Sequence, residues 1–187
     1  MSRSIERADF EAIYKLYADK AVKRFNLTGN HPPQLYGVKL GKELGKIEGT
    51  YSLNKVAPLF FDGTFPKAQI RDLLAQLTTP GSPIRKMAVQ FDVILPDIVV
   101  QINEVWQSNK KKPEGMSDAE FKKLEHQLPS EDPNREEAIA VFMHAYQYST
   151  MGSCPIRSKP RRHAVMGEMF PEDGKMTGRL SLTIDDE

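Results

Sequence analysis

Hydrophobic residues recur at helical spacing over the first 25 residues of the chain. Apolar positions fall three or four apart from Ile5 to Phe25, which is the period of a helix with one buried face. Ser4 is a residue type that caps helix starts, and Glu6 follows it in the positively polarised first turn. The pattern predicts an amphipathic helix over Ser4–Phe25, which ends at the Gly- and Pro-containing stretch NLTGNHPP.

Two strands and two further helices are predicted before residue 96. Glycine-punctuated segments near Leu35–Leu40 and Gly45–Leu53 predict a pair of short strands at a hairpin or sheet edge. A proline in the first turn and an apolar stripe predict a helix over Pro66–Leu77. The segment from Ser82 has enough apolar residues for a buried strand, but a serine followed by proline favours a helix that ends before Pro96.

The second half of the chain is dominated by segments rich in β-branched and aromatic residues. A polar excursion at about 108–135 interrupts them, and within it Ser117 and Glu120 have the spacing of a capping box, which predicts a short helix. The stretch TMGSCPIRSKP is predicted to be a turn between two strands. The predicted strands are Asp97–Gln107, Glu137–Ser149, Arg162–Phe170 and Arg179–Ile184.

Helices followed mostly by strands predict an α+β fold. We expect a mainly antiparallel, twisted sheet packed against N-terminal helices. A chain of 187 residues is expected to form a single domain over residues 1–187. Its helical part would extend to about residue 95 and its strand part over about 97–184, with the polar insertion at about 108–135.

Charge and cysteine content narrow the class of protein without giving a function. The net charge is +1, so no global field attracts DNA or an anionic membrane. One cysteine cannot form an internal disulfide, which favours a cytoplasmic protein. The N-terminus has no apolar signal segment, and the most apolar stretch, VILPDIVV, is too short to cross a membrane.

The motifs for phosphate loops, cysteine phosphatases and zinc sites all fail on residue spacing. Gly37 and Gly41 are one residue too close for a phosphate loop, and Pro160 stands where a cysteine phosphatase needs its arginine. No paired Cys or His spacing typical of zinc occurs, so we expect no metal and no cofactor. Cys154 could still act as a nucleophile if His144 or His163 folded beside it, although a lone cysteine is more often chemically idle.

Three titratable residues lie within apolar stripes of predicted strands. Glu104 shares a face with Ile102 and Trp106, and His144 and Glu168 are placed in the same way in their own segments. If these faces coincide, Glu104, His144 and Glu168 are candidate catalytic residues for acid–base chemistry or metal binding. The commoner alternative is that each residue is paired structurally or lies on an open face.

Two basic segments stand out although the total charge is close to zero. They are candidate binding segments for phosphates, with the aromatic side chains of Trp106, Tyr146 and Tyr148 available for base stacking. The commoner outcome for such segments is solvated loop ends. Their cationic residues are Lys110, Lys111 and Lys112 in the first, and Arg157, Lys159, Arg161 and Arg162 in the second.

From Asp97 to about Ala145, a strand ending NEVW is followed by a polar loop and then by LPSEDPNREEAIAV. This arrangement resembles small uncharacterised proteins of bacteria and their phages, in which a strand ending Glu-x-Trp precedes a Pro-Ser-x-x-Pro-x-Arg-x-Glu segment and another strand. The matching positions here are Glu104, Trp106, Pro129, Ser130, Pro133, Arg135 and Glu137. The resemblance implies no activity, but Arg135 has the chemistry to form a bidentate ion pair with Glu104 or Glu137.

We expect a small cytoplasmic accessory protein of a bacterium or phage that acts by binding a protein or nucleic-acid partner. The alternative is a small acid–base hydrolase, with or without a metal, that uses Glu104, His144 and Glu168. A homo-oligomer through an edge strand at Leu35–Leu40 is a further option. Membrane association is not expected.

Overall fold

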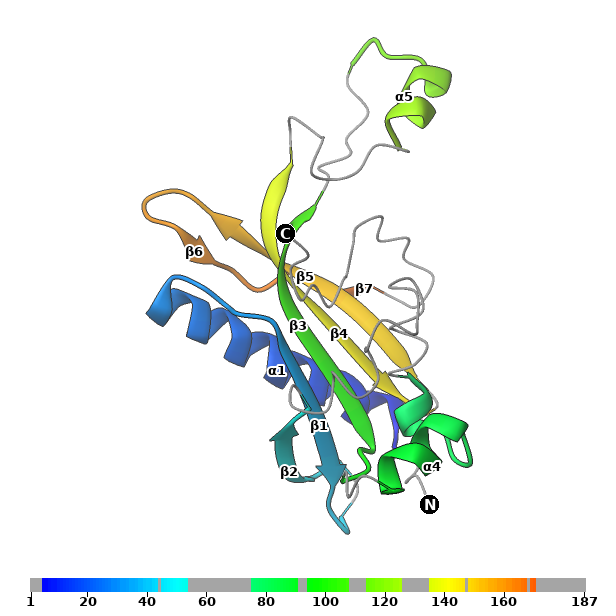
Figure 1. Ribbon diagram of the computed structural model, residues 1–187. Coiled ribbons are helices and arrows are strands. Elements are labelled where there is room, and N and C mark those ends of the chain that lie inside the picture. The colour runs from blue at the N-terminus through cyan, green and yellow to red at the C-terminus, as the bar shows by residue number, and fades with distance from the viewer. Residues whose placement is uncertain are drawn as a thin grey trace.

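The protein has an α+β fold in which a long N-terminal helix lies across one face of an antiparallel sheet (Figure 1). The computed structural model describes residues 5–43, 45–53, 75–90, 94–107, 114–125, 135–146, 148–167 and 169–170. The helices are α1 (Arg7–Thr28), α4 (Pro83–Gln90) and α5 (Asp118–Glu125). The strands are β1 (Gln34–Leu40), β2 (Ile47–Ser52), β3 (Ile98–Gln107), β4 (Glu136–Ala145), β5 (Ser149–Arg157), β6 (His163–Ala164) and β7 (Met169–Phe170).

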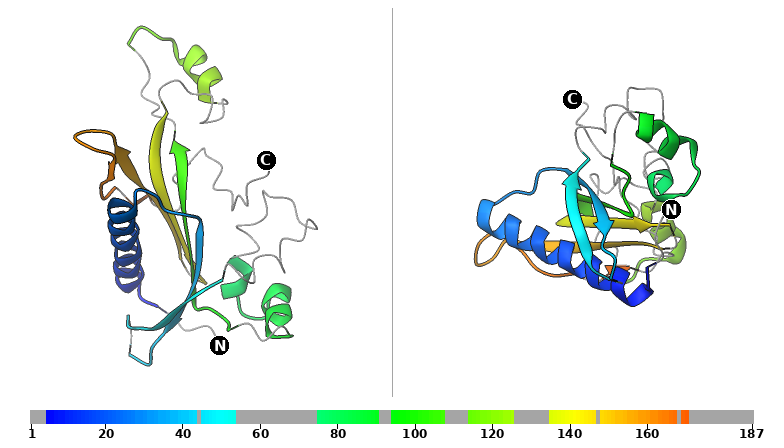
Figure 2. Two further views of the ribbon diagram at one scale, coloured as in Figure 1. Left: turned by 60° about the vertical axis from the view of Figure 1, so that its left-hand side comes forward. Right: turned by 90° about the horizontal axis from the view of Figure 1, so that it is seen from below.

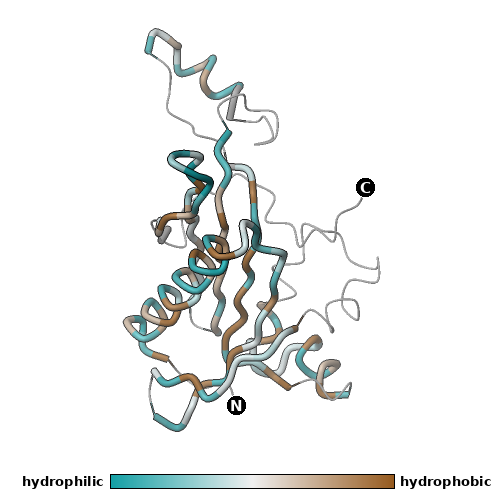
Figure 3. The backbone as a smooth tube through the Cα atoms, turned by 90° about the vertical axis from the view of Figure 1, so that its left-hand side faces the viewer, coloured by the Kyte–Doolittle hydropathy of each residue, from teal (hydrophilic) through white to brown (hydrophobic). Residues whose placement is uncertain are grey.

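Helix α1 buries its apolar stripe against the sheet, as the sequence pattern predicts. Its core positions include Phe10, Tyr14, Tyr17 and Phe25, which pack on side chains from β1, β3 and β4. The helix extends one turn further than expected and ends at Gly29, whose left-handed backbone (φ 80°) places its N–H on the Phe25 carbonyl at 2.7 Å. Figure 3 shows hydrophobic and hydrophilic positions alternating along the helix.

The strands pair in the order β2-β1-β3-β4-β5-β6, and β7 also pairs with β5. Every pair is antiparallel. The β1–β2 hairpin agrees with the two strands expected there. The expectation that Leu35–Leu40 is an edge strand is wrong, because β1 pairs with β2 on one side and with β3 on the other.

A second, smaller core lies on the other face of the sheet. Ile84 and Ala88 of α4 pack there with Leu35 and Val99, so α1 and α4 cover opposite faces (Figure 2). Ser82 caps α4, since its hydroxyl accepts the N–H of the third helical residue at 3.1 Å. This favours the helical interpretation of the segment over the strand. Helix α5 likewise begins with the predicted capping box, and it projects beyond the ends of β3 and β4 (Figure 1).

Two predictions in the second half of the chain need correction. The segment TMGSCPIRSKP is mostly strand rather than turn, because residues 149–157 form β5 and pair with β4. Only the five residues 158–162 form the connection to β6.

Several predictions lie outside the described residues. They are the strand Arg179–Ile184, the cations Lys110–Lys112, the candidate Glu168 and most of the helix Pro66–Leu77. In the described ranges no helix is long and apolar enough to cross a membrane.

Candidate functional site

Glu104 and His144 lie on opposite faces of the sheet. Alternation along β3 places Glu104 on the side of Ile102, which packs against α1. His144 is paired with Val99, which belongs to the core on the other side, and its ring stacks with that of Phe142 at 6.3 Å. The two described members of the predicted acid–base group therefore do not share a cleft. Within the described residues, no group of three His, Cys, Asp or Glu side chains could hold a metal ion.

Arg162 organises the charged groups on the α1 side of the sheet. Its Nε and Nη2 each lie 3.1 Å from an oxygen of Glu137, and Nη1 donates to the Gly29 carbonyl at 2.8 Å. Nη2 also lies 3.7 Å from Glu104, and the guanidinium carbon lies 4.8 Å from the centre of the Phe25 ring. The sequence analysis predicted that Glu137 pairs with an arginine, but it proposed Arg135. The contact with Arg162 was missed because no local pattern shows that the connection after β5 returns to the end of β4.

These contacts attach the β5–β6 hairpin to the end of α1. The Asn26 side chain adds two hydrogen bonds to the backbone of Ala164, at 2.7 and 3.1 Å. A cation at the Gly29 carbonyl also interacts favourably with the negative end of the helix. Glu137 raises the pKa of Arg162 above its ordinary value, so this side chain stays charged. Arg162 is therefore a structural contact, although the sequence placed it among the binding residues.

The remaining cations of the hairpin are exposed. Arg157, Lys159 and Arg161 make no ion pair or side-chain hydrogen bond with any residue that the structure describes. Figure 3 shows hydrophilic positions gathered along this loop beside α1. Three positive charges on one hairpin, with no partner among the described residues, form a local positive field, even in a protein of net charge +1.

Trp106 lies beside the residue that anchors this hairpin to the sheet. It is the cross-strand neighbour of Glu137, the residue that holds Arg162, and the two side chains point to one face. The Trp106 side chain is 44% exposed, and the guanidinium of Arg135 lies 4.6 Å from its ring centre. Of the other predicted stacking residues, Tyr148 packs on Phe10 in the core at 5.6 Å. We name the five residues Trp106, Arg135, Arg157, Lys159 and Arg161 the hairpin surface.

Cys154 does not have the environment of a nucleophile. Its side chain is 2% exposed and belongs to the core beneath α1. Burial raises the pKa of the thiol, and a hydrogen bond with Gly167 offsets this only in part. His144 lies on the opposite face, and the Nδ1 of His163 bonds to the Arg161 carbonyl at 2.7 Å. The chemically idle alternative therefore describes Cys154 better than the catalytic one.

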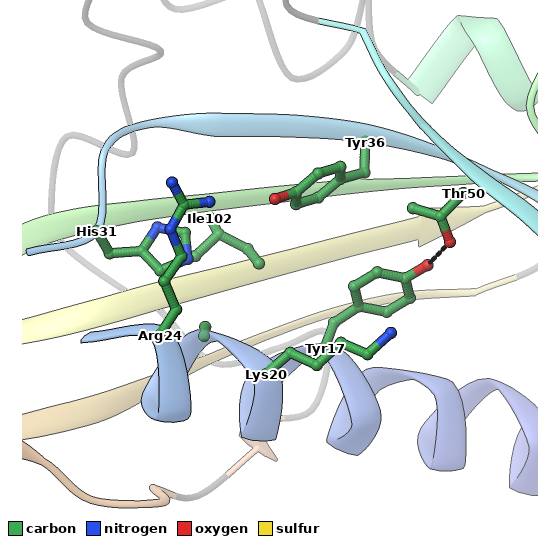
Figure 4. A pocket seen from close by; sticks show the side chains of 8 residues that line it. Tyr17, Lys20, Arg24, His31, Tyr36, Thr50 and Ile102 are labelled. Atoms are coloured by element: carbon green, nitrogen blue, oxygen red, sulfur yellow. Dashed lines mark hydrogen bonds between the residues drawn. The ribbon is translucent and has the colours of Figure 1, made fainter. Parts of the chain in front are cut away.

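A small pocket that the sequence reasoning missed lies between α1 and strands β1, β2 and β3 (Figure 4). Its volume is about 190 Å³, and Ala21 and Ile102 supply apolar wall. Its polar lining comes from Tyr17, Lys20, Arg24, His31, Tyr36 and Thr50. The only available sequence signal was the spacing of Lys20 and Arg24, which places two cations one above the other on a helix.

No protein-family model, curated protein or solved structure matches the chain. The resemblance carried by the Glu-x-Trp strand therefore stays a prediction. The arguments for function rest on the two surfaces described above, the hairpin surface and the pocket.

Proposed function

We propose that this protein is a small cytoplasmic accessory protein of a bacterium or phage that binds single-stranded nucleic acid at the hairpin surface. The observation that carries the proposal is the combination of exposed hairpin cations that have no partner among the described residues with an exposed tryptophan beside Glu137, the residue that holds Arg162 of the same hairpin. Proteins that bind single strands without sequence preference combine positive charge along the backbone with aromatic rings on which bases stack.

The charges of the hairpin surface support a phosphate partner. Arg157, Lys159 and Arg161 have no carboxylate neighbour among the described residues, so their field is not cancelled locally. The nearby Glu104 and Glu137 are already held by Arg162. A polyanion that contacts these three cations would release counterions, and this release drives much of nucleic-acid binding.

The tryptophan supports an unpaired base. Arg135 stacks over Trp106, and an arginine–tryptophan stack presents a flat, positively charged platform. Stacking of a base on an aromatic residue contributes about 1–3 kcal/mol and requires a base that is not enclosed in a duplex. A single-stranded ligand therefore fits better than a double-stranded one.

The proposal is tested by titrating a labelled single-stranded oligonucleotide into the full chain at several salt concentrations. We expect the logarithm of the association constant to fall linearly with the logarithm of salt concentration, with a slope of about −0.7 per phosphate contact. Because the chain has one tryptophan, quenching of its fluorescence reports contact at Trp106 directly. Arg161→Ala should weaken binding and make the slope shallower by about 0.7.

Two variants separate the hairpin surface from general charge effects. Trp106→Ala should weaken binding about 5- to 150-fold with little change in the salt slope. Lys86→Ala removes an exposed cation from α4, on the opposite side of the sheet, and should leave binding unchanged. Absent binding, or equal loss in Lys86→Ala and Arg161→Ala, would overturn the proposal. Salt-insensitive capture of a protein in place of the oligonucleotide would also overturn it.

A further inference from the structure

The pocket between α1 and the sheet has positive charge that no described residue neutralises. Lys20 and Arg24 both line it, and neither side chain forms an ion pair with any residue in the described ranges. No carboxylate is among the lining residues. Glu104 lies nearby, but its carboxylate accepts the backbone N–H of His31 and faces Arg162. An anion would therefore enter the pocket with favourable electrostatics.

Polar groups from several elements converge on this space. Figure 4 shows the Arg24 guanidinium beside the His31 ring, with the Tyr36 hydroxyl pointing toward them. A hydrogen bond joins the hydroxyl groups of Tyr17 and Thr50 at the other end. Lys20 lies over the Tyr17 ring, with Nζ 5.4 Å from the ring centre.

His31 supplies a hydrogen-bond acceptor among these donors. Its Nδ1 lies 3.0 Å from the Pro32 carbonyl, and a carbonyl oxygen can only accept, so Nδ1 carries the proton. Burial lowers the pKa of the ring, which favours the neutral form. The Nε2 atom of a neutral ring protonated at Nδ1 has a free lone pair. A ligand that bears both negative charge and a proton would satisfy the whole set.

The volume restricts the size of the ligand. One water molecule occupies about 30 Å³ in the liquid, and sites for drug-sized molecules enclose about 300–1,000 Å³. The pocket encloses about 190 Å³, so it can take one polyatomic group but not a whole nucleotide. Lys20, Arg24 and Thr50 are exposed at its rim, so the rest of a larger ligand would extend into solvent.

We propose that this pocket is a binding site for a single phosphate group, held by Arg24, Lys20 and the Tyr36 hydroxyl and sharing one proton with Nε2 of His31. A phosphate presents three acceptor oxygens, which matches donors that come from both α1 and β1 better than the two oxygens of a carboxylate do. This site is separate from the hairpin surface and does not depend on nucleic-acid binding.

The shared proton makes a prediction about pH. The charged and titratable groups around His31 are Tyr17, Lys20 and Arg24 from α1, Tyr36 from β1 and Glu104 from β3. With His31 neutral, a singly ionised phosphate monoester donates its remaining proton to Nε2, whereas the doubly ionised monoester must first take up a proton. Affinity for a monoester should therefore fall as the pH rises through its second ionisation, whereas inorganic phosphate keeps one proton through that ionisation and should not show this fall.

The test is a titration of the full chain with inorganic phosphate, followed by the NMR signals of the His31 ring. We expect these signals to shift with saturation, and Arg24→Gln to weaken binding about tenfold or more. Arg24 is exposed and its guanidinium is unpaired in the described structure, so this variant should fold. Tyr36→Phe, which removes only the hydroxyl, should weaken binding by a smaller factor.

The matched control is Arg161→Gln, which removes the same charge from the hairpin surface. It should bind phosphate as tightly as the unmodified protein does. Arg24→Gln should still bind an oligonucleotide that has no terminal phosphate. The two variants therefore distinguish a failure of the phosphate-site proposal from a failure of the nucleic-acid-binding proposal. Unchanged His31 signals at tens of millimolar phosphate would overturn the proposal, as would an equal response to chloride at the same ionic strength. Equal phosphate affinities of Arg24→Gln and Arg161→Gln would also overturn it.

Discussion

Arg162 and Glu137 meet side on, with both of their nitrogen–oxygen distances at 3.1 Å. Glu137 belongs to β4 and Arg162 to the connection between β5 and β6, 25 positions further along the chain. The same guanidinium reaches the Gly29 carbonyl at the end of α1. One side chain therefore joins the helix, the sheet and the basic hairpin, and it fixes the position from which the exposed hairpin cations project.

Replacing Arg162 should loosen this junction. Arg162→Lys cannot form the bidentate pair and also reach Gly29, so we expect the free energy of unfolding to fall by about 1–2 kcal/mol. The pair is partly exposed, with side chains 43% and 35% accessible, and this keeps the expected loss small. Urea denaturation measures the loss. Arg161→Ala should change stability by less than about 0.5 kcal/mol, and an equal loss in both variants would contradict the assigned role.

Gly167 lies where no side chain fits. A Cβ atom at this position would overlap the Ser153 carbonyl oxygen, which belongs to the backbone of β5 and cannot rotate away. Gly167→Ala should lower the free energy of unfolding by roughly 1–3 kcal/mol. Gly49→Ala is the matched control, because a Cβ there meets no atom within 4 Å. Thermal unfolding compares the two, and similar melting temperatures would count against the close approach.

His31 should make stability depend on acidity. Burial lowers its pKa in the folded protein below the ordinary value of 6.5, so the unfolded chain binds the proton first as the pH falls. Stability should therefore decrease as the pH drops below about 6.5 and level off once the folded protein is also protonated. His31→Asn keeps a donor near the Pro32 carbonyl but has no imidazole. Urea denaturation at several pH values should show a weaker acid dependence for this variant, and an unchanged dependence would disprove the explanation.

The Cys154 thiol should be inert in the folded protein. Its side chain is 2% exposed, and burial raises its pKa, so neither access nor ionisation favours reaction. We expect a thiol reagent to label it slowly at pH 7–8 and rapidly in concentrated urea. Gly167→Ala should speed native-state labelling, because the clash of its Cβ with the Ser153 carbonyl would push apart the backbone that contacts and covers this thiol. Rapid labelling of the unmodified protein would restore the nucleophile hypothesis.

The elements that the sequence predicted well are those whose signals are local. The apolar stripe of α1 repeats every three or four residues, so each step is visible within one helical turn. The cap at Ser82 and the capping box at Ser117 each involve residues only three positions apart. The alternation of β3 and β4 is equally local. The α+β class follows from the order of such elements along the chain, so the sequence was sufficient for it.

Strand β5 was missed because its own residues argue against it. The segment STMGSCPIR contains glycine, proline and small polar residues, which are typical of turns. It forms a strand because β4 offers seven consecutive partners, from Ala138 to His144. Pairing with a neighbouring strand overrides intrinsic preference when the neighbour is already fixed in a sheet.

The sequence by itself determined which residues share a face within each strand, but not which faces of different strands coincide. That depends on register, because a shift of one residue moves a whole strand to the other face. The observed register pairs Glu104 with Ile139 and His144 with Val99, which places the two titratable residues on opposite sides. Tertiary structure alone also brought Arg162 to Glu137 and closed the phosphate-sized pocket, since both assemble residues from distant segments that no local pattern relates.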